Sequence, residues 1–252
     1  MKIYALFLDI DNTLYYNGKV PKRNVDALAE ARKLGHFIFL NTARSMGFIP
    51  KEMFDEVPLD GAVAGIGTDL RFRGKQIFHN LMSQDECFEI AKYFRNDSRE
   101  VGFEGEDTVV WMNPRARRHA KDILENPADF YGKFKNYKIN KMYVEGALSD
   151  SEMTLFGKKY IMYRHERYSE FCPKGFGKAE GMFRMLDYLN LPGENSIAFG
   201  DSANDEDMLK AAGISVAMGN AIPEIKKICD FVSCDAKDGG VGEAVEKLLL
   251  NK

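Results

Sequence analysis

Long apolar runs, paired cysteines and an excess of one charge are all missing from this sequence of 252 residues. No segment reaches the ~18 consecutive apolar residues of a membrane-spanning helix, so we expect no membrane partner. The net charge is -3, with 35 Lys and Arg against 38 Asp and Glu, and this gives nucleic acid no general electrostatic reason to bind. The remaining composition is that of an ordinary globular α/β protein.

The four cysteines are few and widely spaced, and no two of them form a C-x-x-C pair. Reduced, mostly buried thiols are therefore favoured over disulfides or a zinc site. The first apolar run could imitate a secretory leader, but Asp9 and Asp11 end it too early. Together these features predict a cytoplasmic protein. The cysteines are Cys87, Cys172, Cys229 and Cys234.

The most informative feature is the apolar run of residues 3–8, which ends directly in Asp9 and Asp11. So continuous a run predicts a parallel strand that is covered on both faces. Ligands of such sheets bind beyond the carboxyl ends of the strands, and alternation places both carboxylates on one side. Two neighbouring carboxylates repel each other unless a cation or a shared proton lies between them. The pair therefore suggests a metal site.

Strands and helices alternate at both ends of the chain, which predicts one doubly wound parallel sheet. The segment between them changes to longer amphipathic helices and alternating strands, with helices expected at residues 85–94 and 114–126. We therefore predict a Rossmann-like core with an inserted α/β cap domain. The core would comprise residues 1–82 and 168–252, and the cap residues 83–167. Strands are expected in the cap at residues 108–113, 140–145 and 159–164.

Three further signals follow Asp9 and Asp11 along the chain, each at an expected strand end or helix start: Thr42, Lys178 and the segment 200–205, Gly-Asp-Ser-Ala-Asn-Asp. Each has an ordinary explanation when taken alone. A threonine can cap a helix, a lysine can lie on a helix surface, and acidic or amide residues favour helix starts. Their joint occurrence in this order favours one shared site.

Together these segments resemble the four motifs of the haloacid dehalogenase superfamily of phosphatases. The matching features are the D-x-D-x-T start, a hydroxyl after the second strand, a helical lysine and G-D-x-x-N-D. The inserted segment resembles the Cof-type branch in its layout. The resemblance covers nearly the whole chain and implies a phosphatase with an aspartyl-phosphate intermediate.

The resemblance also implies a role for each motif residue. Asp9 would be the nucleophile, and Asp11 would protonate the leaving group and then activate water. A Mg²⁺ ion would be bound by Asp9, Asp201 and the main-chain carbonyl of Asp11. The expected phosphate-binding residues are Thr42, Ala43, Lys178 and Asn204. Thr13 and Asp205 would hold these residues in position through hydrogen bonds, with Asp205 orienting Lys178 or a metal-bound water.

Three positions depart from the commonest pattern of the family. Asn12 follows the second aspartate where glycine is frequent, and asparagine tolerates a left-handed backbone better than other non-glycine residues. Ala43 and Ala179 also stand where glycine is common. These changes add only methyl-sized bulk, so they affect substrate fit more than chemistry.

The expected cap holds a basic run beside Trp111, which suits either a second phosphate or the solvated face of a helix. We favour the solvated face. Arg164 and His165, near the return to the core, could reach the substrate or form a linker hydrogen bond. The basic run consists of Arg115, Arg117, Arg118, His119 and Lys121.

The predicted function is Mg²⁺-dependent hydrolysis of a small phosphorylated metabolite, either a sugar phosphate or a phosphorylated cofactor, by a monomer or weak homodimer. One alternative is a phosphomutase, which would return the phosphoryl group from Asp9 to a sugar hydroxyl. Another is a phosphorylation-dependent signalling module. Receiver modules, however, place the phosphorylated aspartate after a later strand and lack an inserted cap.

Overall fold

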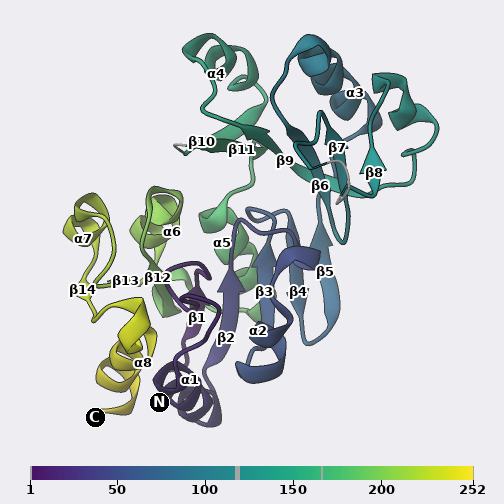
Figure 1. Cartoon of the computed structure of the whole chain (residues 1–252). Coiled ribbons are helices and arrows are strands. Elements are labelled where there is room, and N and C mark those ends of the chain that lie inside the picture. Colours follow the sequence, from purple (N-terminus) through teal and green to yellow (C-terminus); the bar gives the residue numbers. More distant parts are fainter. Residues whose placement is uncertain (1, 117–119, 166, 252) are drawn as a thin grey trace.

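The computed structural model describes residues 2–116, 120–165 and 167–251. Its larger part contains an eight-stranded sheet in the order β14-β13-β12-β1-β2-β3-β4-β5 (Figure 1). The strands from β14 to β3 are parallel, and the hairpin of β4 and β5 continues the sheet antiparallel. The strands are β1 (Ala5–Leu8), β2 (Phe37–Asn41), β3 (Gly61–Ala64), β4 (Asp69–Phe72), β5 (Lys75–His79), β12 (Ser196–Gly200), β13 (Ile214–Ala217) and β14 (Phe231–Val232).

Helices cover both faces of this sheet, as the continuous apolar run of β1 predicts. Leu6 and Leu8 belong to one apolar cluster, and Ala5 and Phe7 belong to another, so successive side chains are buried on opposite faces. The first cluster includes α1 and α8, and the second includes α5, α6 and α7. These helices are α1 (Lys22–Lys33), α5 (Lys178–Leu189), α6 (Glu206–Ala211), α7 (Pro223–Ile228) and α8 (Gly240–Val245), and α2 (Lys51–Glu56) follows β2.

The smaller part is built on a six-stranded sheet in the order β10-β11-β9-β6-β7-β8. Helices α3 (Gln84–Tyr93) and α4 (Asp150–Phe156) pack with it around buried aromatic residues such as Phe103 and Phe171. Figure 1 shows this cap beyond one end of the core sheet. Its strands are β6 (Val101–Gly105), β7 (Val109–Met112), β8 (Asp122–Ile123), β9 (Ile139–Glu145), β10 (Tyr160–Arg164) and β11 (Tyr168–Pro173).

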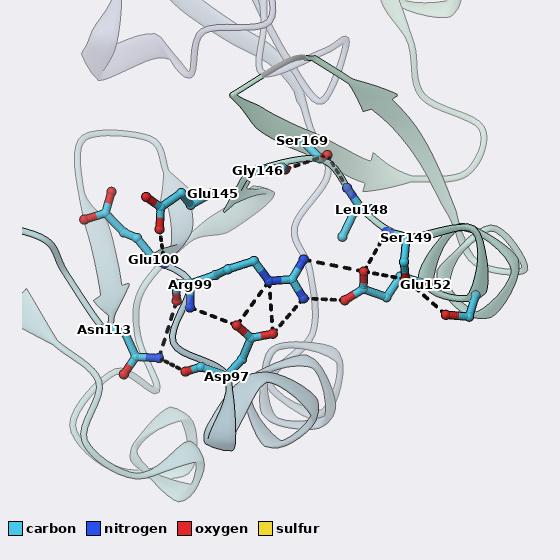
Figure 2. Close-up of polar contacts among 11 residues, drawn as sticks. Asp97, Arg99, Glu100, Asn113, Glu145, Gly146, Leu148, Ser149, Glu152 and Ser169 are labelled. Carbon is cyan, nitrogen blue, oxygen red and sulfur yellow. Dashed lines mark hydrogen bonds and ion pairs between the residues drawn. The ribbon is translucent and has the colours of Figure 1, made fainter.

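A partly buried polar network links α4 to the segment that precedes β6. Arg99 bonds the carboxylates of Asp97 and Glu152, and Glu152 also accepts the main-chain N–H of Ser149 at 2.7 Å (Figure 2). In turn, the side-chain oxygen of Ser149 accepts the main-chain N–H of Glu152. These two reciprocal hydrogen bonds form a capping box at the start of α4. This network stabilises the cap and contributes nothing to the cavity described below.

Two expectations for the cap need correction. A helix over residues 114–126 is wrong for the described part of that segment, where β8 pairs with β7 and Leu124 donates to the Trp111 carbonyl at 2.8 Å. Asn113, at φ 52°, turns the chain before Pro114. Pairing with β7 thus replaces helical hydrogen bonds. Strand β11 begins at residue 168, where we expected the core to resume, but it pairs with β9 and β10, so the cap sheet extends to Pro173.

Because no helix forms over the described part of residues 114–126, the residues of the basic run do not lie on a helix face there. Arg115 is exposed, and its Nη2 lies 2.6 Å from Glu145 Oε2, while Lys121 is also exposed. Arg117, Arg118 and His119 lie outside the described residues.

Every helix among the described residues is too short or too polar to cross a lipid bilayer.

Candidate active site

The carboxyl ends of β1, β2 and β12 meet at the edge of the core sheet that faces the cap. Asp9 follows β1, Thr42 follows β2 and Asp201 follows β12, and all three line one cavity of about 650 Å³ between core and cap. Parallel pairing of β1 with β2 and β12 brings these three chain segments together. The cavity also contains the predicted residues Asp11, Ala43 and Asn204.

Lys178, the first residue of α5, lies at the centre of the buried charges. Its Nζ is 2.6 Å from Asp9 Oδ1 and 2.6 Å from Asp205 Oδ1, and its side chain is 1% exposed. The second oxygen of Asp205 accepts the main-chain N–H groups of Asp201 and Ser202 at 3.0 and 3.1 Å. Asp205 therefore holds both the lysine and the loop after β12.

Glycine is required at position 200 by this close approach. A Cβ atom there would lie 2.6 Å from the Cβ and Cγ atoms of Asp205, well inside van der Waals contact. The G-D-x-x-N-D pattern thus has a packing reason as well as a chemical one.

Asp9, Asp201 and Asp205 form an acidic cluster in which one oxygen from each lies within 4.8 Å of the others. Both oxygens of Asp205 already accept hydrogen bonds. The bonds of Asp9 and Asp201 among the described residues fall on Oδ1, from Lys178 and from Thr13. Each of these two side chains thus has one oxygen left for another ligand. Such oxygen donors fit a hard divalent cation.

The electrostatics of the cluster point the same way. Burial, with the nearby charge of Asp205, raises the pKa of Asp9 to about 8 against the opposing effect of Lys178. Burial and Asp205 also raise the pKa of Asp201 to about 7. Burial alone would lower the pKa of Lys178, but Asp205 and Asp9 outweigh it and raise that pKa above its usual value. With all three aspartates ionised, the cluster would have more negative charge than its lysine balances, and a bound cation would relieve that excess.

A pH dependence of cation binding follows. Because Asp9 and Asp201 would have to lose their protons to bind a divalent cation, the affinity for such a cation should rise as the pH increases through about 7 and 8. Below both pKa values it should fall by about tenfold per pH unit for each proton displaced. Titration calorimetry across this range, in buffers of different ionisation enthalpy, would measure the affinity and the protons released. An affinity independent of pH would contradict the assignment of these ligands.

Asp11 lies outside the buried cluster. Its side chain is 53% exposed, and both of its oxygens accept from Arg44, whose Nε and Nη2 each lie 2.8 Å away. Arg44 also donates from Nη1 to the carbonyl of Phe48 at 2.9 Å. Arg44 is not among the site residues predicted from the sequence, although its position directly after Thr42 and Ala43 at a strand end was an available signal.

The turn after β1 has the conformation expected of Asn12. Its φ is 59°, and its N–H donates to the Tyr15 carbonyl at 2.9 Å. This left-handed residue turns the chain so that Thr13 becomes fully buried. The Thr13 hydroxyl then donates to Asp201 Oδ1 at 3.3 Å, which places Thr13 behind a candidate metal ligand.

The other predicted phosphate-binding residues lie on two loops of the same cavity. Thr42 is almost fully buried, and its Oγ1 accepts the main-chain N–H of Arg44 at 3.1 Å. Ala43 and Asn204 also line the cavity, and Asn204 Oδ1 accepts the Ser202 hydroxyl at 2.9 Å. Their contacts with a phosphoryl group stay predictions.

The cap supplies a set of cavity residues that the motifs did not reveal. Lys141 Nζ lies between two glutamates, 3.2 Å from Glu104 Oε2 and in direct contact with Glu170 Oε1. His165 also lines the cavity, with its Nε2 3.6 Å from Glu170 Oε2. Arg164, in contrast, is exposed and lies 3.0 Å from Asp150. A charged residue within an expected strand, such as Lys141, does not by itself distinguish a cavity residue from one on a solvated face, so the sequence held no specific signal for this set.

Comparison with known proteins agrees with this geometry. The family model described as haloacid dehalogenase-like hydrolase matches residues 6–245. The chain is 28% identical to "Putative phosphatase YkrA" of Bacillus subtilis over 259 residues, which cover 98% of each protein. It is 37% identical over 257 residues to "Putative bifunctional phosphatase/peptidyl-prolyl cis-trans isomerase" of Streptococcus pyogenes, covering 99% of this chain and 54% of that protein.

Two solved structures share the whole fold. BT1666 from Bacteroides thetaiotaomicron, analysed as one of the phosphatases of the superfamily, superposes with a TM-score of 0.85 at 25% identity, covering 97% of this chain and 94% of its own. BT4131, described as a subclass IIB sugar phosphatase, gives 0.84 at 22% identity and covers 97% and 98%. The expected Rossmann-like core with an inserted cap is thereby confirmed. With a family match that spans nearly the entire length, this chain belongs to the haloacid dehalogenase-like hydrolases and is a phosphatase of that superfamily.

Proposed function

We propose that this phosphatase hydrolyses the phosphomonoester of a small metabolite in two steps, with Mg²⁺ as cofactor and Asp9 as the nucleophile. One observation carries the proposal: Asp9 faces the cavity while it shares a buried ammonium group with Asp205 and an acidic cluster with Asp201. This arrangement suits attack by an anion on another anion, since Lys178 and a bound divalent cation would together supply positive charge where negative charge develops.

One oxygen each from Asp9 and Asp201, with the main-chain carbonyl of Asp11, would hold the Mg²⁺ ion. When bound, the ion neutralises the charge on the phosphoryl oxygens and lowers their repulsion with the nucleophile. Thr13 would keep Asp201 in place through its hydroxyl, and Asp205 would keep Lys178 in place.

In the first step, the Asp9 carboxylate attacks phosphorus, and the bond to the ester oxygen breaks. Asp11, at the cavity rim, takes up a proton before this step and donates it to the departing alkoxide, while its other oxygen can still accept from Arg44. In the second step, Asp11 takes a proton from water, which attacks phosphorus and releases phosphate and Asp9. The Thr42 hydroxyl, the Ala43 N–H, Asn204 and Lys178 would stabilise the phosphoryl oxygens in both steps.

The substrate class that we propose first is a sugar phosphate, and the second is a phosphorylated cofactor. BT4131, a structural neighbour that covers 97% of this chain, is described as a sugar phosphatase. The cavity of about 650 Å³ has the size of a typical small-molecule site. The cap would exclude water and select the leaving group.

The function is tested by phosphate release from a panel of phosphorylated metabolites with and without Mg²⁺. We expect release of free phosphate that matches the dephosphorylated product mole for mole and that stops when EDTA removes the cation. Formation of a sugar bisphosphate without free phosphate would identify a phosphomutase. A stable phosphorylated protein without turnover would identify a signalling module.

Asp11→Asn should separate proton transfer from attack. The backbone carbonyl remains, but the side chain can no longer protonate the alkoxide, so kcat on sugar phosphates should fall by about 10²- to 10⁴-fold. On p-nitrophenyl phosphate, whose leaving group needs no proton, kcat of the variant should fall much less. Steady-state kinetics on both substrates measure the difference, and an equal loss on both would exclude Asp11 as the acid.

A further inference from the structure

The side of the cavity opposite the acidic cluster is formed by the cap alone. We call the cap residues that line it the cap wall. Strand pairing sets its geometry: Glu104 of β6 lies opposite Lys141 of β9, and Glu170 of β11 lies opposite Tyr143 of β9. Three neighbouring strands therefore present one continuous surface toward Asp9. The cap wall consists of Glu104, Lys141, Tyr143, His165, Tyr168 and Glu170.

The single lysine of the cap wall has no positive charge to spare. Its side chain is 2% exposed and contacts both Glu104 and Glu170. Burial alone would raise the pKa of Glu170, but Lys141 outweighs burial and lowers it to about 2, so this carboxylate is ionised. Burial raises the pKa of Glu104 against the opposing charge of Lys141, so one ammonium group lies between an ionised carboxylate and a second acidic side chain, and the wall has no net positive charge.

The remaining cation of the cavity is paired in the same way. Arg44 and Lys141 are the Lys and Arg residues among the described residues that line the cavity, and Arg44 is occupied by both oxygens of Asp11. Lys178 lies behind Asp9 and is engaged by two aspartates. A second anionic group on the substrate would therefore meet Glu104 and Glu170 without an unpaired cation to bind it.

The rest of the cap wall suits an uncharged, hydroxyl-rich molecule. The rings of Tyr143 and Tyr168 are 5.8 Å apart, and His165 stacks on Tyr168 at 4.4 Å. Aromatic faces of this kind cover the C–H groups of a sugar or alditol. The contacts of Glu104 with Lys141 and Ser45 both fall on Oε2, so its Oε1 remains an acceptor for substrate hydroxyl groups.

We propose that the cap wall is a charge filter: it accepts phosphomonoesters whose leaving group is an uncharged polyol and rejects those that carry a second phosphate or a carboxylate. The proposal rests on the hydrolysis proposed above, and it assigns the selection to Glu104, Glu170 and the neutralised Lys141.

Matched substrates test the filter in the unmodified enzyme. Glycerol 3-phosphate and 3-phosphoglycerate differ by one carboxylate, and fructose 6-phosphate and fructose 1,6-bisphosphate differ by one phosphate. We expect kcat/KM to be at least about tenfold higher for the uncharged member of each pair. Equal or higher values for the anionic members would overturn the filter and leave the phosphatase function standing. If none of the four compounds released phosphate, the result would contradict both the charge filter and the proposed hydrolysis.

Two variants identify the residues. Glu104→Gln and Glu170→Gln each remove one acidic group and leave Lys141 paired with the other, so the wall should repel an anionic substrate less strongly. Each should raise kcat/KM for 3-phosphoglycerate relative to glycerol 3-phosphate by about tenfold. Glu89→Gln, on the exposed side of α3 and outside the cavity lining, is the matched control and should leave the ratio unchanged. A ratio that stays at the wild-type value in both folded variants, checked by thermal melting, would overturn the assignment.

Discussion

Asp9→Asn is expected to lower kcat by on the order of 10⁴ or more while the protein stays folded. An amide has the shape of the carboxylate but cannot attack phosphorus, so the covalent step is lost. The fold should survive because a neutral group costs less to bury and Lys178 keeps its contact with Asp205. Phosphate-release kinetics and thermal melting would measure the two effects. Asp26→Asn, on the exposed face of α1, is the matched control. Activity within tenfold of wild type would remove Asp9 as the nucleophile.

Lys178→Met should cause the largest loss of stability. The substitution leaves Asp9 and Asp205 buried without their cation, and breaking such a pair costs about 3–5 kcal/mol of the free energy of unfolding. Urea denaturation without added metal would measure the change. Lys210→Met serves as the control, because its contact with Glu206 is exposed and such surface pairs contribute little to the free energy of unfolding.

A double variant separates charge from packing at this position. Adding Asp205→Asn to Lys178→Met removes one of the two unpaired carboxylates, so the double variant should be more stable than the sum of the single effects predicts. A loss of less than about 1 kcal/mol for Lys178→Met, or strict additivity in the cycle, would contradict a central role for the buried ammonium group.

Much of the core followed from local pattern. The apolar run before Asp9 predicts a strand buried on both faces, and the segment that starts at Lys178 predicts a helix. The structure contains both elements, because continuous apolar sequence and helical periodicity are local properties. Asn12 adopts the left-handed conformation that its side chain tolerates. The helix expected over residues 114–126 failed because β8 gains its hydrogen bonds from β7, a partner that no local pattern identifies.

The candidate site also has one part whose position could be predicted from the sequence and one part whose position could not. Asp9, Thr42, Lys178 and Asp201 could be predicted because each follows a strand or starts a helix in a fixed order. The cap wall could not, because Lys141 and Glu170 face the cavity only through the register of three antiparallel strands. Charged residues in strands ordinarily indicate a solvated face, and only the tertiary arrangement shows these two to be buried.

Trapping the phosphoryl group on the protein would test the central claim most directly. Borohydride reduces an acyl phosphate, so treatment of the enzyme during turnover should convert the phosphorylated aspartate to homoserine, which mass spectrometry of peptides can locate. We predict homoserine at position 9 in the wild-type protein and no modification in Asp9→Asn. Reduction at a different aspartate, or none under conditions where turnover is rapid and intermediate breakdown limits the rate, would contradict the mechanism.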